Sequence, residues 1–137
     1  MRLIGFLVLV AVVGLMGYVR LAPSDPARWH AMPEDVTEQD LAGGAIRVVE
    51  GAGRATLERL DAIAMETPRT TRLAGSVEEG MITYVTRSRV FGFPDYTTVR
   101  LAGDRLELFG RLRFGASDMG VNAARLDGWL ERLGQGG

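Results

Sequence analysis

The stretch RLELFGRLRF at positions 105–114 decides the fold that this sequence predicts. Its leucines and its final phenylalanine occupy even positions, whereas its charged residues and Phe109 occupy odd positions. Because a strand turns successive side chains to opposite faces, the stretch predicts a strand with one apolar face and one charged face. The apolar face is expected to pack against other elements of the chain.

Further strands precede this stretch. The sequence predicts them at residues 45–49, 70–77, 81–90 and 96–101. Tight turns at residues 78–80 and 102–104, together with a loop at 91–95, join the last four strands. Consecutive strands joined by such short connections run antiparallel, so these four are expected to form a meander.

Two amphipathic helices are expected to cover the apolar face. Residues 54–66 place Leu57, Leu60 and Ile63 at helical spacing, and Pro68 ends that helix. Residues 121–133 do the same with Leu126, Trp129 and Leu133. The sequence therefore predicts an α+β fold, an antiparallel sheet of four to five strands with two helices packed on one face. The predicted order is β-α-β-β-β-β-α, preceded by one N-terminal transmembrane helix.

The N-terminal segment is apolar. Residues 3–19 read LIGFLVLVAVVGLMGYV, and their seventeen uncharged residues lie at the lower limit for crossing a bilayer. An uncleaved signal-anchor is expected; a cleaved signal peptide and a buried core helix are the alternatives. The short N-terminal tail favours an N-in, C-out topology. The protein is therefore expected to be held in an inner membrane through residues 3–19, as a single-pass protein with its C-terminal domain in the periplasm or an equivalent space.

Three parts of the chain follow from these patterns. Residues 1–20 form the anchor, residues 21–44 a proline-containing, acidic tether, and residues 45–137 the α+β domain. Trp29 lies in the tether, where it is expected either to anchor at the bilayer surface or to dock in the core of the domain.

Composition excludes several classes of function. The net charge of −1 gives no field that would draw the protein to nucleic acid. All 16 basic residues are arginine, and the chain has no cysteine and only one histidine, His30. Thiolate and multi-histidine metal sites, cysteine nucleophiles and histidine-based triads are therefore excluded, and no metal or cofactor is expected.

The charged face of the predicted sheet gathers arginines. Arg87 and Arg89 share one parity in their strand, and Arg111 and Arg113 share the charged parity of theirs. Arg100 and Arg105 add to this face, which is expected to be open. It could bind an anionic partner, such as lipid headgroups, an acidic polymer or an acidic protein. The alternative is a solvated face whose arginines pair with nearby carboxylates.

Asp95 and Asp118 are candidate catalytic residues, because a pair of carboxylates can perform acid–base chemistry. Asp95 lies in a predicted loop, and Asp118 lies just before the closing helix. Nothing in the sequence brings them together. Capping of the helix by Ser117 or Asp118 is the alternative.

The sequence FGASDMGVN at 114–122, followed by Ala124, Arg125 and Leu126, closely resembles the closing motif of the domain of unknown function 1499 family. Residues 70–72, 84–88 and 93–95 resemble its central strands, so that the resemblance covers about residues 45–133. Leu112 and Met119 depart from the family pattern, which commonly has serine and leucine there.

The resemblance implies a small bacterial or plastid protein, often exported or membrane-associated, without an assigned activity. It directs attention to five polar residues at motif positions, which are Arg113, Ser117, Asp118, Asn122 and Arg125. These residues are expected to form a hydrogen-bond network at the corner between strand and helix, or to bind a ligand. Within the network, Asp118 is expected to pair with Arg113 or Arg125.

Three functions are therefore considered. The first is a non-enzymatic accessory or binding domain that contacts an acidic partner, a membrane complex or anionic lipid. Its predicted binding residues are Arg87, Arg89, Arg111, Arg113, Ser117, Asp118, Asn122 and Arg125. The second is a lipid- or ligand-binding carrier, which needs a cavity of about 300 Å³ or more between sheet and helices. The third is a hydrolase that uses Asp95 and Asp118.

Overall fold

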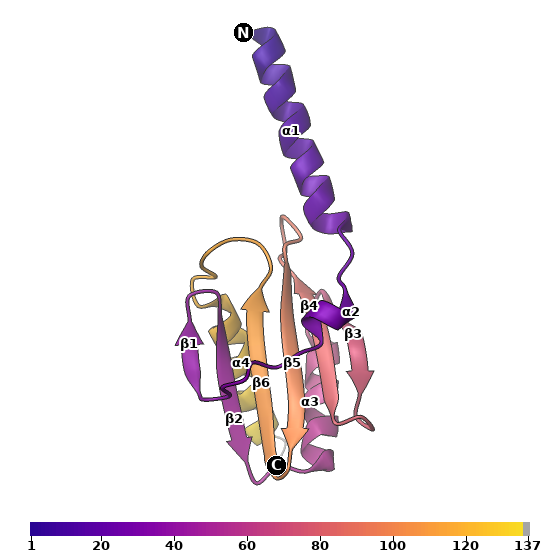
Figure 1. The fold of residues 1–137 in the computed structure, drawn as a ribbon, viewed down its shortest axis with the longest axis vertical. Helices are drawn as coiled ribbons and strands as arrows, with labels where there is room; N and C mark the ends of the chain where they lie inside the picture. Colours follow the sequence, from indigo (N-terminus) through magenta and orange to yellow (C-terminus); the bar gives the residue numbers. More distant parts are fainter. Residues whose placement is uncertain (136–137) are drawn as a thin grey trace.

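The computed structural model describes residues 1–135 and shows a six-stranded sheet with two helices packed against one face (Figure 1). A long N-terminal helix extends away from one end of this sheet. The helices are α1 (Arg2–Leu21), α2 (Pro26–Trp29), α3 (Arg54–Glu66) and α4 (Val121–Gln135). The strands are β1 (Gln39–Leu41), β2 (Gly44–Glu50), β3 (Thr70–Ser76), β4 (Met81–Arg87), β5 (Pro94–Ala102) and β6 (Arg105–Leu112).

The strands are arranged in the order β1-β2-β6-β5-β4-β3, and every neighbouring pair is antiparallel. The predicted α+β class and the anchor-like N-terminal helix are thus confirmed, but the sheet has six strands and not four to five. The additional strand, β1, lies within the predicted tether. All three of its residues are exposed, so no apolar alternation could reveal it.

The alternation in residues 105–114 places the leucines of this strand on the apolar face of the sheet, as predicted. Leu106 and Leu108 are fully buried on the side of the sheet that faces α3 and α4. They lie opposite Leu101 and Val99 of β5, across a hairpin whose turn contains Gly103 at a φ of +63°. Only glycine enters that left-handed region without steric cost, so this turn fixes the register of the hairpin.

The space between the sheet and its two helices is filled by side chains from both layers. The large side chains of this core that are fully buried are Leu57, Leu60, Ile82, Tyr84, Val99, Leu106, Leu108 and Leu126. Trp129 closes the core with its ring edge-on to Tyr84, at 5.7 Å between centroids. The carrier hypothesis required a cavity in this layer, and the packing there leaves that hypothesis without support.

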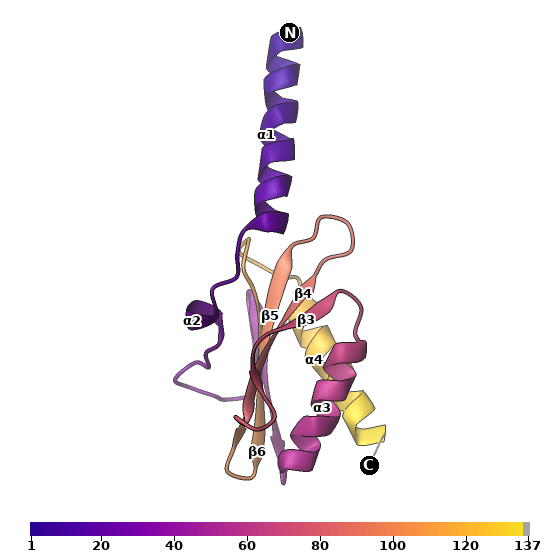
Figure 2. The same cartoon turned by 90° about the vertical axis from the view of Figure 1, so that its right-hand side faces the viewer.

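The opposite face of the sheet is covered by residues 22–38, which we call the strap (Figure 2). Trp29 lies in the strap and stacks on Tyr96 of β5, with 4.0 Å between ring centroids and 11° between planes. Only 9% of Trp29 is exposed, so of the two expectations for this residue the structure supports docking on the domain. The strap makes the domain a sheet covered on both faces.

The sheet has two distinct ends. The proximal end, from which α1 extends, carries the turn at residues 67–69 and the loops at 88–93 and 113–120. β4 and β6 end at Arg87 and Leu112, earlier than predicted, so Arg89 and Arg113 lie beyond the strands at this end. The distal end carries the turns of the β3–β4 and β5–β6 hairpins.

α1 is long and apolar enough to cross a membrane, although a signal sequence would have the same properties. Its apolar side chains are exposed along nearly its whole length, and only Val19, near its end, is buried. A buried core helix would show the opposite pattern, so that alternative for the N-terminal segment is wrong.

Candidate functional site

Arg111 and Arg113, two arginines of the charged sheet face, bind the strap of the same chain. Arg111 donates hydrogen bonds to the carbonyl oxygen of Trp29 and, at 2.8 Å, to the hydroxyl of Thr98. Arg113 donates to the carbonyl oxygen of Pro23, at 3.0 Å, and to the hydroxyl of Tyr96, at 3.1 Å. Backbone carbonyls occur in every segment, so the sequence could not show that these arginines bind carbonyl oxygens of the strap.

The expectation of an open arginine face is therefore wrong. Burial lowers the pKa of Arg111 to about 10, which reflects the loss of water around a cation that has no carboxylate partner in the described part of the chain. Carbonyl oxygens and the ring of Phe109, 4.4 Å from the guanidinium carbon, replace part of that hydration. Arg100 and Arg105 lie farther down the same face, and both pair with Glu107.

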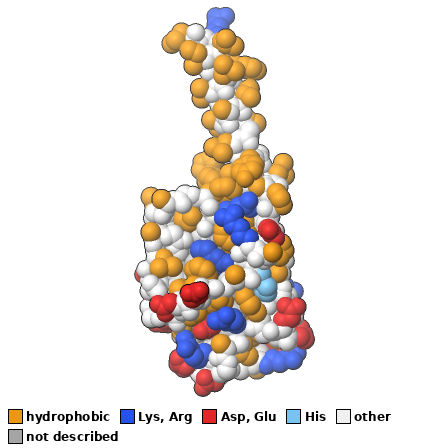
Figure 3. Space-filling model, in the orientation of Figure 1, with side chains coloured by type: hydrophobic (Ala, Val, Ile, Leu, Met, Phe, Trp, Pro, Cys, Tyr) orange, Lys and Arg blue, Asp and Glu red, His pale blue; other side chains and the backbone are white. Residues whose placement is uncertain are grey.

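A second group of arginines lines a pocket of about 490 Å³ at the proximal end. We call it the arginine pocket. Its cationic residues are Arg20, Arg69, Arg87 and Arg89, and Thr70, Thr71, Val85, Ser88 and Gly92 complete its lining. Figure 3 shows basic side chains where α1 meets the domain, with most acidic side chains nearer the other end.

The end of α1 is tied to this pocket through Arg20. Its guanidinium donates to the carbonyl oxygens of Val90, at 2.7 Å, and Phe91, at 3.3 Å. Gly92 makes the approach possible: it has a φ of +72°, and a Cβ there would lie 3.0 Å from Cγ of Arg20. The contact fixes the loop at 88–93 against the last turn of α1.

Two strand ends supply the other side of the pocket. Arg87 donates from Nη1 to the carbonyl oxygens of Gly92, at 2.9 Å, and Val19, at 3.3 Å. Arg69 donates from Nε to the carbonyl oxygen of Arg87, at 2.9 Å. Arg69 has a φ of +57°, an unfavourable conformation for a residue with a Cβ. Strain of this kind is concentrated at functional sites, where the side chain matters more than local stability.

The pocket is electrostatically unbalanced. None of its four arginines has a carboxylate within 4 Å among residues 1–135, whereas seven arginines elsewhere in that range do. Nη1 of Arg20, both Nη atoms of Arg69, and Nε and Nη2 of Arg87 have no protein acceptor in that part of the chain. Planar forks with free donors favour phosphate or carboxylate groups.

The polar residues of the closing motif form a separate structure, which we call the corner. Asp118 accepts hydrogen bonds from the backbone N–H groups of Gly120 and Asn122, both at 3.0 Å, and from Nδ2 of Asn122 at 2.8 Å. Asp118 thus caps the start of α4, as one of the two expectations held. Ser117 is exposed, and its hydroxyl accepts only from the N–H of Met119.

Arg125 pairs with a different carboxylate from the one predicted. Its Nη2 lies 3.4 Å from Oδ2 of Asp95, and its Nη1 donates to Oδ1 of Asn122 at 2.8 Å. The expected pairs of Asp118 with Arg113 or Arg125 are wrong, because Arg113 reaches the strap and Asn122 occupies the carboxylate of Asp118. Sequence spacing could not predict which arginine pairs with which carboxylate.

Asp95 and Asp118 do line one small surface pocket, of about 180 Å³. Burial raises the pKa of Asp95, and Asp118 adds to this, although Arg125 opposes it. Burial also raises the pKa of Asp118, but hydrogen bonds from Asn122 and Gly120 outweigh this and hold it below its usual value. Both carboxylates are thus occupied by partners of the same chain, which disfavours their use in hydrolysis.

The predicted binding residues fall into three places. Arg87 and Arg89 lie in the arginine pocket, Arg111 and Arg113 lie under the strap, and the other four form the corner. Sequence reasoning missed Arg20 and Arg69 as pocket residues. Their positions, directly after the apolar run and directly after Pro68, were the available signals.

A family model described as "Protein of unknown function (DUF1499)" matches residues 19–133. No curated protein matches the chain. Among residues 1–135, no group of three or more histidine, aspartate and glutamate side chains could hold a metal ion. The matched range begins at the end of α1 and includes the strap.

Proposed function

The chain belongs to the DUF1499 family, and we propose that it is a membrane-anchored, non-enzymatic binding domain whose arginine pocket holds the phosphate of a lipid headgroup. One observation carries the proposal. Four arginines that have no carboxylate partner among residues 1–135 surround a pocket beside the end of an apolar helix. A phosphate group at the bilayer surface carries negative charge to balance these arginines and oxygens that can accept hydrogen bonds from their free N–H donors.

The location follows from α1. We propose that α1 stays attached and crosses the inner membrane once, with the domain in the periplasm. Arg20 would then lie at the level of the headgroups, because it directly follows the last apolar turn. Arginine side chains at the ends of membrane-spanning helices extend toward the headgroups in this way. An acidic protein of a membrane complex is the second candidate partner for the same pocket.

The anchor can be tested directly. The protein extracted from membranes is expected to keep its first 20 residues, because α1 is tied to the domain by Arg20 and Arg87. Intact-mass measurement of the untagged protein decides this. A mass that lacks the apolar segment would show cleavage and remove the membrane premise, whatever the pocket binds.

The pocket can be tested with the variant Arg69→Gly/Arg89→Gln. Glycine suits the φ of +57° at position 69, and Arg89 is exposed, so the fold should tolerate both changes. Binding of glycerol 1-phosphate to the full chain, in an uncharged detergent, is measured by titration calorimetry. The affinity should fall at least about tenfold, since each lost charged hydrogen bond is worth about 1.5–3 kcal/mol.

The matched control removes the same charge elsewhere. Arg54 and Arg132 are exposed arginines of α3 and α4, outside the pocket, and Arg54→Gln/Arg132→Gln should leave the affinity nearly unchanged. Equal affinity for the two double variants would mean that only net charge matters. Absence of binding in the unmodified protein would leave the acidic protein partner as the remaining candidate.

A further inference from the structure

We infer that the proximal end of the domain is immersed in the bilayer interface through an apolar tip formed by Val90, Phe91, Phe93 and Met119. The inference rests on the proposed membrane anchoring by α1 but not on anion binding by the arginine pocket. The surface it assigns consists of different residues, carried by the loops at 88–93 and 113–120. Its partner is the lipid of the leaflet from which α1 emerges.

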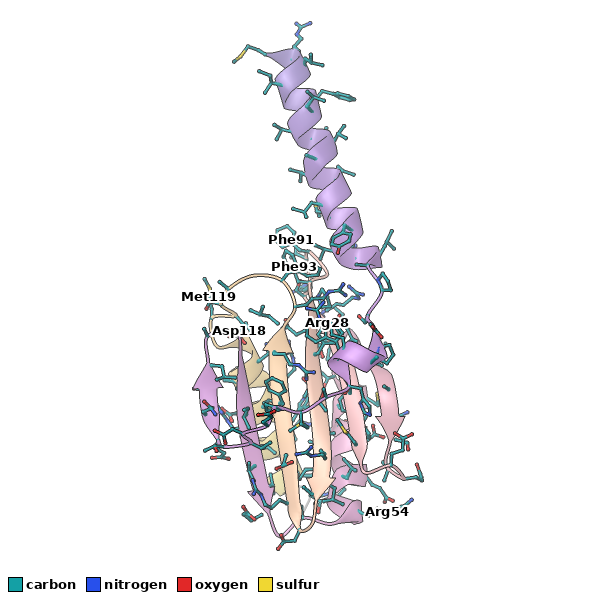
Figure 4. All side chains as sticks on the ribbon, viewed as in Figure 1. Arg28, Arg54, Phe91, Phe93, Asp118 and Met119 are labelled. Atoms are coloured by element: carbon teal, nitrogen blue, oxygen red, sulfur yellow. The ribbon has the colours of Figure 1, made fainter. Side chains whose placement is uncertain are left out.

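The four side chains of the tip are apolar and exposed. The exposed fractions are 66% for Val90, 50% for Phe91, 42% for Phe93 and 93% for Met119. Figure 4 shows Phe91, Phe93 and Met119 at the end of the sheet nearest α1, with Phe91 beside Phe93 and Met119 to one side of them, and Arg54 at the opposite end. Apolar groups clustered on one surface are typical of a binding face, whereas scattered ones are not.

The aromatic residues of the tip continue the surface of α1. Tyr18, in the last turns of α1, contacts Phe114 with 6.1 Å between ring centroids. Phe114 lies 6.4 Å from Phe93, and Phe93 lies 5.8 Å from Phe91. Aromatic side chains of membrane proteins gather at the level of the headgroups, and this row lies where α1 would leave the hydrocarbon.

The length of α1 also favours a position of the tip close to the membrane. Its seventeen uncharged residues span about 25 Å as a helix, whereas the hydrocarbon core is about 30 Å thick. A span that is too short draws its flanking residues toward the membrane. Because Arg20 binds the carbonyl oxygens of Val90 and Phe91, the loop that carries the tip must follow α1.

Met119 gives independent support. Its φ of +54° is unfavourable for any residue with a Cβ, and its side chain is 93% exposed. Glycine or asparagine would suit this backbone better. A side chain this exposed has little protein surface to pack against, and insertion into lipid would explain a long apolar residue at this position. The distal end is different: Glu50, Glu78, Glu79 and Asp104 are exposed there.

The absence of cysteine makes a direct test possible. Four single-cysteine variants of the full chain, Phe91→Cys, Met119→Cys, Glu79→Cys and Val10→Cys, are labelled with a nitroxide and placed in phosphatidylcholine/phosphatidylglycerol nanodiscs. Paramagnetic resonance then measures collision of each label with oxygen, which enters lipid, and with a nickel chelate, which stays in water. Glu79, in the distal hairpin turn, is the aqueous control, and Val10, within α1, is the control for the span.

The labels at 91 and 119 should show an oxygen-to-nickel collision ratio several-fold above that at 79 and approaching that at 10. Labels at 91 and 119 that match the one at 79, with the label at 10 in lipid, would overturn the inference but leave the anchor and the pocket intact. Shielding of 91 and 119 from both reagents would indicate a covering protein, such as a second copy, and would also overturn it. A label at 10 in water would remove both proposals.

Discussion

Replacing Trp29 with alanine is expected to lower the free energy of unfolding by about 3 kcal/mol, near the lower end of the range for a buried large aromatic residue. Trp29 is 9% exposed and stacks on Tyr96 at 4.0 Å between ring centroids. Its carbonyl oxygen also accepts hydrogen bonds from Arg111 and from the hydroxyl of Thr98. Loss of the indole should therefore release the strap from the sheet and expose a buried cation to water.

Urea unfolding followed by circular dichroism measures the effect, and hydrogen exchange of residues 22–38 reports release of the strap. The matched control is Arg28→Ala, which removes only an exposed guanidinium 4.6 Å from the centroid of the same indole ring. That change should cost about 0.5–1 kcal/mol or less. If Trp29→Ala costs no more than Arg28→Ala, the strap is not an integral part of the domain.

The role of the strap explains why the sequence predicted one face of the sheet and not the other. The face toward α3 and α4 is built from leucines at alternate positions, and Leu106 and Leu108 are buried as their spacing indicates. The other face is covered by a segment without periodic apolar residues. It is held by its carbonyl oxygens, by one docked indole and by hydrogen bonds between Ser24 and Tyr96 and between His30 and Thr83, none of which periodicity reveals.

The arginine pocket lies beyond sequence reasoning for a similar reason. Arg20 and Arg69 are separated by about fifty residues. The pairing of β3 with β4 places Arg69 beside Arg87, but only the tie between α1 and the loop at 88–93 brings Arg20 to them. The arginines of the strands were identified, but the sequence could not distinguish those under the strap from those in the pocket. The distinction depends on where the strands end, since residues 88–90 belong to the loop at 88–93 and not, as predicted, to the end of β4.

The corner leads to the second large prediction. Asn122→Ala is expected to lower the free energy of unfolding by about 2–4 kcal/mol, because two hydrogen bonds to charged groups are lost in a buried place. Asn122 is fully buried, and its amide joins the carboxylate of Asp118 to the guanidinium of Arg125. Gly110 leaves room for it on the sheet: a Cβ at that position would lie 3.0 Å from Oδ1 of Asn122.

The measurement also separates a structural role of the closing motif from a binding role. If the corner only fixes α4 on the sheet, Asn122→Ala should shift the urea midpoint, whereas Ser117→Ala, at an exposed neighbouring position, should have little effect on stability. Binding of glycerol 1-phosphate should persist in both variants while they are folded, because the corner and the arginine pocket share no cationic residue. A folded Asn122→Ala protein of normal stability that has lost this binding would instead make the corner part of the binding site.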